Sequence, residues 1–173
     1  SPAVVRHSPG HVGRNQRVRM RVLGQGATDL LPARLPAANL GDGELAEGSN
    51  WESMMAAAHY QLDNLTAIID LNTLQITGHT HEVCDIEPLE QKLQAFGWSV
   101  RDVDGHDITA LRETLESVPL EAGKPNAVIG QTIKGKGISF MENDPSWHHR
   151  VPDDRQYEQA QQELDALLAE VSS

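Results

Sequence analysis

The 173-residue sequence contains only one cysteine and no long apolar run. A single thiol, Cys84, cannot form an intrachain disulfide, which excludes a small secreted domain held together by disulfides. No stretch approaches the roughly 20 apolar residues of a membrane-spanning helix, and residues 1–13 lack the apolar centre of a secretory signal. We therefore expect a soluble chain with no membrane partner, in a reducing, cytoplasmic setting.

Positive charge is also scarce, because the formal net charge is -11. Such a balance makes nucleic acid an unfavourable partner, since its phosphates repel an acidic protein. Residues 1–39 are the exception, with six arginines and one acid. This segment has no lysine and no aromatic residue, and prolines and glycines interrupt it. We expect a basic, poorly ordered arm over residues 1–39 and one domain over residues 40–173.

Short apolar runs and helical periods alternate from Leu40 onward. Strands are predicted at residues 65–71, 98–103 and 126–132, and helices at residues 50–61, 88–96, 107–117 and 154–171. This alternation predicts an α/β fold, with a parallel sheet that carries helices on both faces. Such sheets bind ligands beyond the carboxyl ends of their strands, so the loops there are the candidate sites.

Two hard oxygen donors fall in such loops. Asp42 stands in the turn Gly41-Asp42-Gly43, and Asn72 directly follows the strand predicted at residues 65–71. Magnesium prefers a few protein oxygens together with phosphate oxygens and water. The glycines allow close approach of a diphosphate, and a following helix would add free N–H groups. The alternative is a structural pair, in which Asp42 caps a helix and Asn72 stabilises a turn.

Longer runs around these residues resemble the later part of the thiamine-diphosphate-binding domain of transketolase. The runs are Gly41-Asp42-Gly43-Glu44-Leu45-Ala46-Glu47-Gly48, Trp51-Glu52-Ser53-Met54-Met55, Asp70-Leu71-Asn72-Thr73-Leu74, Val103-Asp104-Gly105-His106-Asp107 and Thr132-Ile133-Lys134-Gly135-Lys136-Gly137. The resemblance extends over residues 40–152. It implies the thiamine-diphosphate-binding α/β fold, present here as an incomplete domain.

The resemblance implies a magnesium-dependent cofactor site. Asp42 and Asn72 would ligate a divalent ion, usually magnesium, with the backbone carbonyl of Leu74 as a third protein ligand. The ion would hold the diphosphate of thiamine diphosphate, and Gly41 and Gly43 would lie against that diphosphate.

Two further residues take implied roles. Glu47 matches a position at the subunit interface, where facing acids couple two active sites, and His148 matches a histidine above the cofactor and near the substrate. Family members transfer a two-carbon ketol unit between sugar phosphates in the pentose phosphate pathway. His106, by contrast, is predicted only to cap the helix that follows it.

The sequence departs from the family pattern before Gly41. A run like Leu23-Gly24-Gln25-Gly26 is normally followed by a long helix and an apolar strand, but here Pro36 and Asn39 stand where that strand belongs. We therefore expect a truncated or altered N-terminal region in which the strand before Gly41 is missing. The pyrimidine-binding domain, with its activating glutamate, would have to come from a separate domain or subunit.

Three functional interpretations follow. The first is a transketolase-like enzyme that needs a partner chain in a homo- or hetero-oligomer. The second is a non-catalytic transketolase remnant or interaction module. The third is a fragment like deoxyxylulose-phosphate synthase, although the runs around Trp51 and Lys134 favour transketolase.

Overall fold

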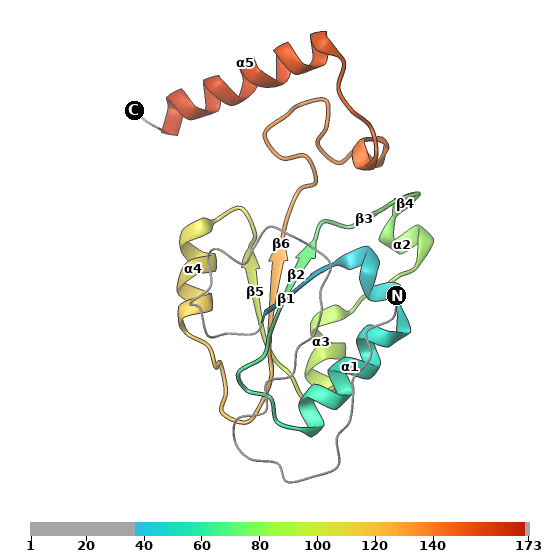
Figure 1. Ribbon diagram of the computed structural model, residues 1–173, viewed down its shortest axis with the longest axis vertical. Coiled ribbons are helices and arrows are strands. Elements are labelled where there is room, and N and C mark those ends of the chain that lie inside the picture. The colour runs from blue at the N-terminus through green and yellow to red at the C-terminus, as the bar shows by residue number, and fades with distance from the viewer. Residues whose placement is uncertain (1–36, 172–173) are drawn as a thin grey trace.

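The computed structural model describes residues 37–171, and its centre is a sheet of four parallel strands in the order β1-β2-β6-β5 (Figure 1). The strands are β1 (Ala37–Gly41), β2 (Thr66–Leu71), β5 (Ser99–Asp104) and β6 (Asn126–Gln131). A small antiparallel hairpin of β3 (Leu74–Gln75) and β4 (Gly78–His79) follows β2. The helices are α1 (Gly48–His59), α2 (Thr80–Val83), α3 (Leu89–Ala95), α4 (Ile108–Glu116) and α5 (Asp154–Val171).

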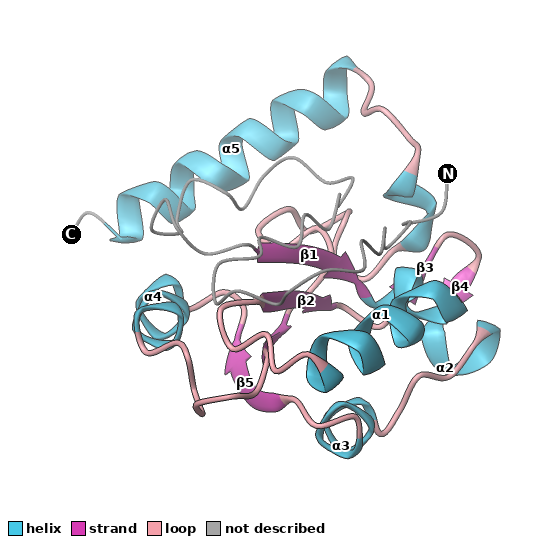
Figure 2. Ribbon diagram, turned by 60° about the horizontal axis from the view of Figure 1, so that its bottom comes forward, coloured by secondary structure: helices cyan, strands magenta, loops and turns pink. Residues whose placement is uncertain are grey.

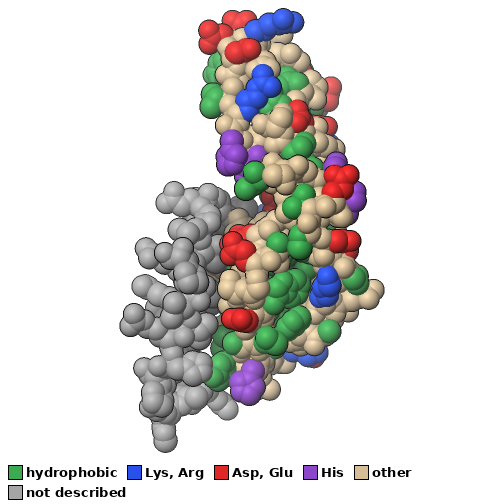
Figure 3. All heavy atoms as spheres, turned by 90° about the vertical axis from the view of Figure 1, so that its right-hand side faces the viewer, with side chains coloured by type: hydrophobic (Ala, Val, Ile, Leu, Met, Phe, Trp, Pro, Cys, Tyr) green, Lys and Arg blue, Asp and Glu red, His purple; other side chains and the backbone are tan. Residues whose placement is uncertain are grey.

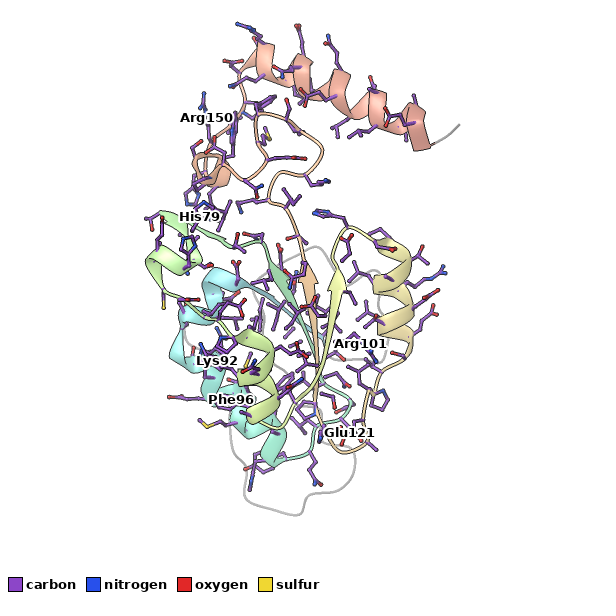
Figure 4. All side chains as sticks on the ribbon, turned by 180° about the vertical axis from the view of Figure 1, so that it is seen from behind. His79, Lys92, Phe96, Arg101, Glu121 and Arg150 are labelled. Carbon is purple, nitrogen blue, oxygen red and sulfur yellow. The ribbon has the colours of Figure 1, made fainter. Side chains whose placement is uncertain are left out.

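Helices cover both faces of this sheet, as the sequence pattern predicted. Helices α1 and α3 lie on one face and α4 on the other (Figure 2). Side chains alternate between the faces along β5: Val100 packs against the core, whereas Arg101 points toward α4 (Figure 4). The parallel α/β architecture is therefore confirmed.

The main core fills the space between the sheet and the helices α1 and α3. Its central strand residues, Ile69 and Ile129, are register partners and are fully buried. The buried Trp98 donates its indole N–H to the carbonyl oxygen of Met54 at 2.9 Å, which joins α1 to the start of β5. Central strands of this kind consist of apolar runs because both faces are covered. Figure 3 views the molecule from the side of α1 and α2, and it shows further hydrophobic side chains exposed at the surface there.

The strand before Gly41 is present, so the expectation that it is missing was wrong. Residues 37–41 form β1 and pair in parallel with β2, with Leu40 opposite Ile69 and Gly41 opposite Asp70. Asn39 is accommodated within this strand because its backbone pairs like any other residue. The strand also begins three residues before the expected domain start at residue 40, while residues 1–36 of the predicted arm lie outside the described part.

A loop and helix α5 lie beyond the carboxyl ends of the strands (Figure 1). The loop leaves β6 at Thr132 and contains the short 3-10 turn η3 (Pro145–His148). Ser139 of this loop donates its backbone N–H and its hydroxyl to the two carboxylate oxygens of Glu163 on α5, at 2.7 and 2.6 Å. Among the described residues of α5, only Ala160 is buried. The apolar residues Tyr157 and Leu168 of this helix are largely exposed.

No helix within residues 37–171 is both long enough and apolar enough to cross a membrane.

Candidate functional site

Asp42 is the buried polar residue at the carboxyl end of β1. It is the first residue of the 3-10 turn η2 (Asp42–Ala46), and only 1% of its surface is exposed. Its Oδ1 accepts the N–H of Gly43 at 2.7 Å, and its Oδ2 accepts the N–H of Thr73 at 2.5 Å. One carboxylate therefore joins the turns after β1 and β2, because Asp42 and Thr73 are 31 positions apart in the sequence.

Burial raises the pKa of Asp42 above its ordinary value, and the negative charge of Asp70 adds to this effect. The backbone N–H groups of Gly43 and Thr73 act in the opposite direction, because they favour the carboxylate. Within residues 37–171, no lysine, arginine or histidine forms an ion pair with Asp42. A buried carboxylate without a counter-charge fits a cation as its partner.

Asn72 and Leu74 lie in the turn that Asp42 holds. Asn72 is 8% exposed, and its Oδ1 accepts the N–H of Leu74 at 3.0 Å. Thr73 between them has a left-handed φ of 64°, which folds the turn back over the strand end. The structure thus places all three predicted metal-site residues in two adjoining turns.

The donor chemistry of this place suits a hard cation. In the described part of the chain, no three histidine, cysteine, aspartate or glutamate side chains gather as a metal cluster. A metal held here would therefore be bound by one carboxylate, one amide oxygen and backbone carbonyls. Magnesium is often held by one or two carboxylates together with phosphate oxygens and water, so the residues present fit it.

The two glycines of the turn differ in their surroundings. A Cβ added to Gly43 would lie 3.1 Å from Cγ of Gln75, so the backbone at Gly43 runs close against a neighbouring segment. A Cβ added to Gly41 would meet no atom within 4 Å. A side chain at Gly43 would therefore require the Gln75 side chain to shift by a few tenths of an ångström, whereas one at Gly41 would meet no described atom.

An open cavity of about 550 Å³ lies at the same sheet edge, at the ends of β2, β5 and β6. The polar side chains that line it come from Asp70, Asn72, His106, Thr132, Lys134 and Lys136. The hydroxyl of Thr132 donates a hydrogen bond to Oδ1 of Asp70, which fixes one wall. The cavity thus offers two lysine cations beside an amide and a carboxylate.

Glu47 and His148 are not among the residues that line this cavity. Glu47 is exposed and occupies the N-cap position of α1, without a capping hydrogen bond from its side chain. His148 ends η3, is exposed, and packs edge-on against His149 with ring centroids 4.4 Å apart. Partial desolvation lowers the pKa of His148, and the charges of Lys134 and His149 lower it further. The charge of Lys134, which lines the cavity, therefore acts on His148 outside it.

His106 has a different role from the one predicted. Asp107 caps α4, because its Oδ1 accepts the N–H of Ala110 at 2.9 Å. His106 instead turns into the cavity wall, where its Nε2 accepts the N–H of Ile133 at 2.8 Å. Its place in the loop that follows a strand was the one sequence signal for a site residue. The bond itself depends on the register between β5 and β6, which sequence spacing does not reveal.

Comparison with known proteins identifies the family. The family model for "Transketolase, thiamine diphosphate binding domain" matches residues 36–166. The chain is 50% identical over 124 residues to one of the subunits of the apulose-4-phosphate transketolase of Actinobacillus succinogenes, and the match covers 72% of this chain and 45% of that protein. It is 40% identical over 126 residues to 6-deoxy-6-sulfo-D-fructose transketolase subunit SqwG of a Clostridium species, covering 73% and 46%.

The fold agrees with these sequence matches. The transketolase of Campylobacter jejuni superimposes with a TM-score of 0.67 at 27% identity, over 79% of this chain and 22% of that chain. The chain spans less than half the length of the two curated relatives described above. The parallel sheet, the polar turns at its carboxyl edge and the matched sequence all lead to one conclusion: the chain belongs to the transketolase family and carries its thiamine-diphosphate-binding domain.

Proposed function

We propose that this chain binds thiamine diphosphate with magnesium at the carboxyl edge of the sheet and contributes that half of a transketolase active site. The reaction would be transfer of a two-carbon ketol unit between sugar phosphates, in carbohydrate metabolism such as the pentose phosphate pathway. The observation that carries this proposal is Asp42, a buried carboxylate without a described cationic partner, next to Asn72.

Asp42 and Asn72 would supply side-chain oxygens to the metal, and the backbone carbonyl of Leu74 a third. Both side chains are already oriented by backbone N–H groups, so little further ordering is needed to bind the ion. Gly41 and Gly43 would lie against the diphosphate. The cofactor, when bound, supplies the carbanion stabilisation that ketol transfer requires.

Other residues would act on the sugar-phosphate side. Lys134 and Lys136 line the cavity and supply positive charge for anionic groups. The lowered pKa of His148 favours its neutral imidazole, the form that can accept a proton from a hydroxyl group. Because His148 lies outside the cavity wall, it would act once substrate and partner complete the site.

The active form would include a partner that carries the pyrimidine-binding domain. The two curated relatives are each named as one subunit of a transketolase, which supports a separate partner subunit in a hetero-oligomer. The exposed Glu47 at the start of α1 is accessible to face another protein chain. A cytoplasmic location is part of this proposal.

A second candidate function is a non-catalytic interaction module. The observation that favours it is the position of Glu47 and His148 outside the cavity that holds Asn72. The presence of β1 weighs against it, because this strand holds Asp42 beside the turn of Asn72, where the proposed cofactor site needs it.

Calorimetric titration with thiamine diphosphate, with and without magnesium, tests the proposal. We expect saturable binding that requires the metal and is lost in Asp42→Ala. The matched control is Asp165→Ala on the exposed surface of α5, which should bind like the unmodified chain. Absence of binding by folded chain, shown by its circular dichroism, would refute the cofactor site and favour the interaction module.

A further inference from the structure

The chain leaves β6 through two residues that are held from both sides. On the β2 side, Thr132 donates its N–H to the carbonyl oxygen of Leu71 at 3.1 Å and its hydroxyl to Asp70. On the β5 side, Ile133 donates its N–H to Nε2 of His106 at 2.8 Å. The next hydrogen bonds along the chain lie within the loop or run to α5, such as Asn143 N–H to the carbonyl oxygen of Lys134. His106 therefore holds the point where the loop separates from the sheet.

The turn that carries His106 packs directly against the residues at the end of β6. Gly105 donates its N–H to the carbonyl oxygen of Gln131 at 2.8 Å. A Cβ on Gly105 would lie 2.4 Å from Cγ2 of Thr132, so only glycine allows the turn to come this close. The side chain of Asp104 accepts the N–H of His106 at 2.8 Å and fixes the backbone of the turn. His106 is therefore presented to Ile133 by a rigid support.

The chemistry of this bond requires a free acceptor at Nε2. A neutral imidazole has one nitrogen with a proton and one without, so Nε2 can accept only while its proton is absent. The residue after Ile133 is Lys134, which lines the cavity and whose charge acts on His148. Fixing the backbone at Ile133 therefore fixes the origin of the Lys134 side chain.

We propose that His106 is a positioning residue of the active site, which holds the backbone at Ile133 so that Lys134 is presented to the cavity and to His148. It acts through the backbone and touches no reacting group. The inference rests on the proposed function only for the identity of the ligands that Lys134 would meet. The hydrogen bond between His106 and Ile133, and its effect on Lys134, do not depend on any ligand.

Three variants of His106 distinguish a role as hydrogen-bond acceptor from a role that only fills space. His106→Gln keeps an acceptor oxygen at about the reach of Nε2, His106→Phe keeps a ring without an acceptor, and His106→Ala removes both. We expect hydrogen exchange of the Ile133 amide to accelerate about fivefold or more in the alanine and phenylalanine variants, as loss of one hydrogen bond implies. The glutamine variant should restore protection, and the Gly105 amide should stay unchanged as an internal control.

The pKa of His148, measured by NMR titration, is the second readout. A loosened loop moves Lys134 away, so the pKa of His148 should rise toward its ordinary value in His106→Ala and His106→Phe but not in His106→Gln. Lys134→Met should raise the same pKa directly and calibrates the change. A merely structural His106 would alter stability without moving this pKa.

The outcomes distinguish this inference from the proposed function. Unchanged Ile133 exchange and an unchanged pKa of His148 in His106→Phe would overturn the positioning role, whether or not cofactor binds. Absence of binding by the unmodified chain would refute the cofactor site while the two NMR measurements still decide the role of His106.

Discussion

At the scale of single residues, the site depends on backbone groups as much as on side chains. Asp42 accepts two N–H groups from two different turns, and His106 accepts one from a third. The bonds from Thr73 to Asp42 and from Ile133 to His106 join residues that follow different strands. A substitution that shifts one of these turns therefore affects the site without removing any functional side chain.

Gly105 gives the sharpest test of this dependence. In Gly105→Ala the new Cβ would meet Thr132 and come within 3.0 Å of the carbonyl oxygen of Gln131. We expect the free energy of unfolding to fall by about 1–3 kcal/mol, the usual cost of crowding a packed position. Gly48→Ala is the matched control, because a Cβ there meets nothing within 4 Å.

The control should be neutral or stabilising by about 0.4–1 kcal/mol, since alanine restricts the unfolded chain. Urea unfolding of both variants measures these differences. Equal stability of the two variants would show that the turn at Gly105 has room to move.

At the scale of elements, the loop after β6 is held at one end by the sheet and at the other by α5. Glu163 on α5 accepts both the N–H and the hydroxyl of Ser139, and Gln159 donates to the same carboxylate at 2.8 Å. The Ser139 hydroxyl bond, with the bond from Gln159, holds the pKa of Glu163 below its ordinary value. The contact between loop and helix therefore depends on an ionised carboxylate.

We expect this contact to weaken in acid. The lowered pKa means that the contribution of Glu163 is present above its ordinary value of 4.5 and is lost as pH falls through the lower, folded value. Glu163→Gln should reproduce that loss at neutral pH, because one amide oxygen replaces two carboxylate oxygens. The hydrogen-exchange protection factor of the Ser139 amide reports both effects.

Glu158→Gln, on the exposed surface of the same helix, should leave the protection of Ser139 unchanged. Equal loss of protection in both variants would show that charge on α5, rather than the Glu163 contact, holds the loop.

The elements that could be predicted are those whose pattern is local. The apolar run of β2 and the periodic residues of α5 identify them directly, and the polar turns at Asp42 and Asn72 stand in recognisable motifs. Strand β1 escaped prediction because its sequence Ala-Ala-Asn-Leu-Gly has no β-branched residue, and its structure comes from pairing with β2. The contact of His106 with Ile133 escaped for a similar reason, since strand register sets it.

At the scale of the whole molecule, the sheet core and α5 are unequal partners. Within residues 37–171, the core cluster contains residues from the sheet, α1 and α3, among them the fully buried Leu93, and none from α5. The one buried residue on the described part of α5 is Ala160. We therefore expect most of the free energy of unfolding to come from the sheet core, whereas α5 mainly holds the loop after β6 in place.

Removal of residues 154–173 tests this division. We expect the melting temperature to fall by less than about 3 °C, which for a chain of this size is roughly 1 kcal/mol. Leu93→Ala in the intact chain should cost about 2–5 kcal/mol, as loss of a fully buried leucine side chain does. Calorimetry of both proteins makes the comparison, and a truncated chain that is less stable than Leu93→Ala would contradict it.

The polar turns around Asp42, Asn72 and His106 come together only when all four strands are paired. A ligand at this edge would recognise the folded chain and ignore the unfolded one. At a hundredfold excess over its dissociation constant, such a ligand adds about 2.7 kcal/mol to the free energy of unfolding. With thiamine diphosphate as the proposed ligand, the supply of that cofactor would set how long each polypeptide survives proteolysis.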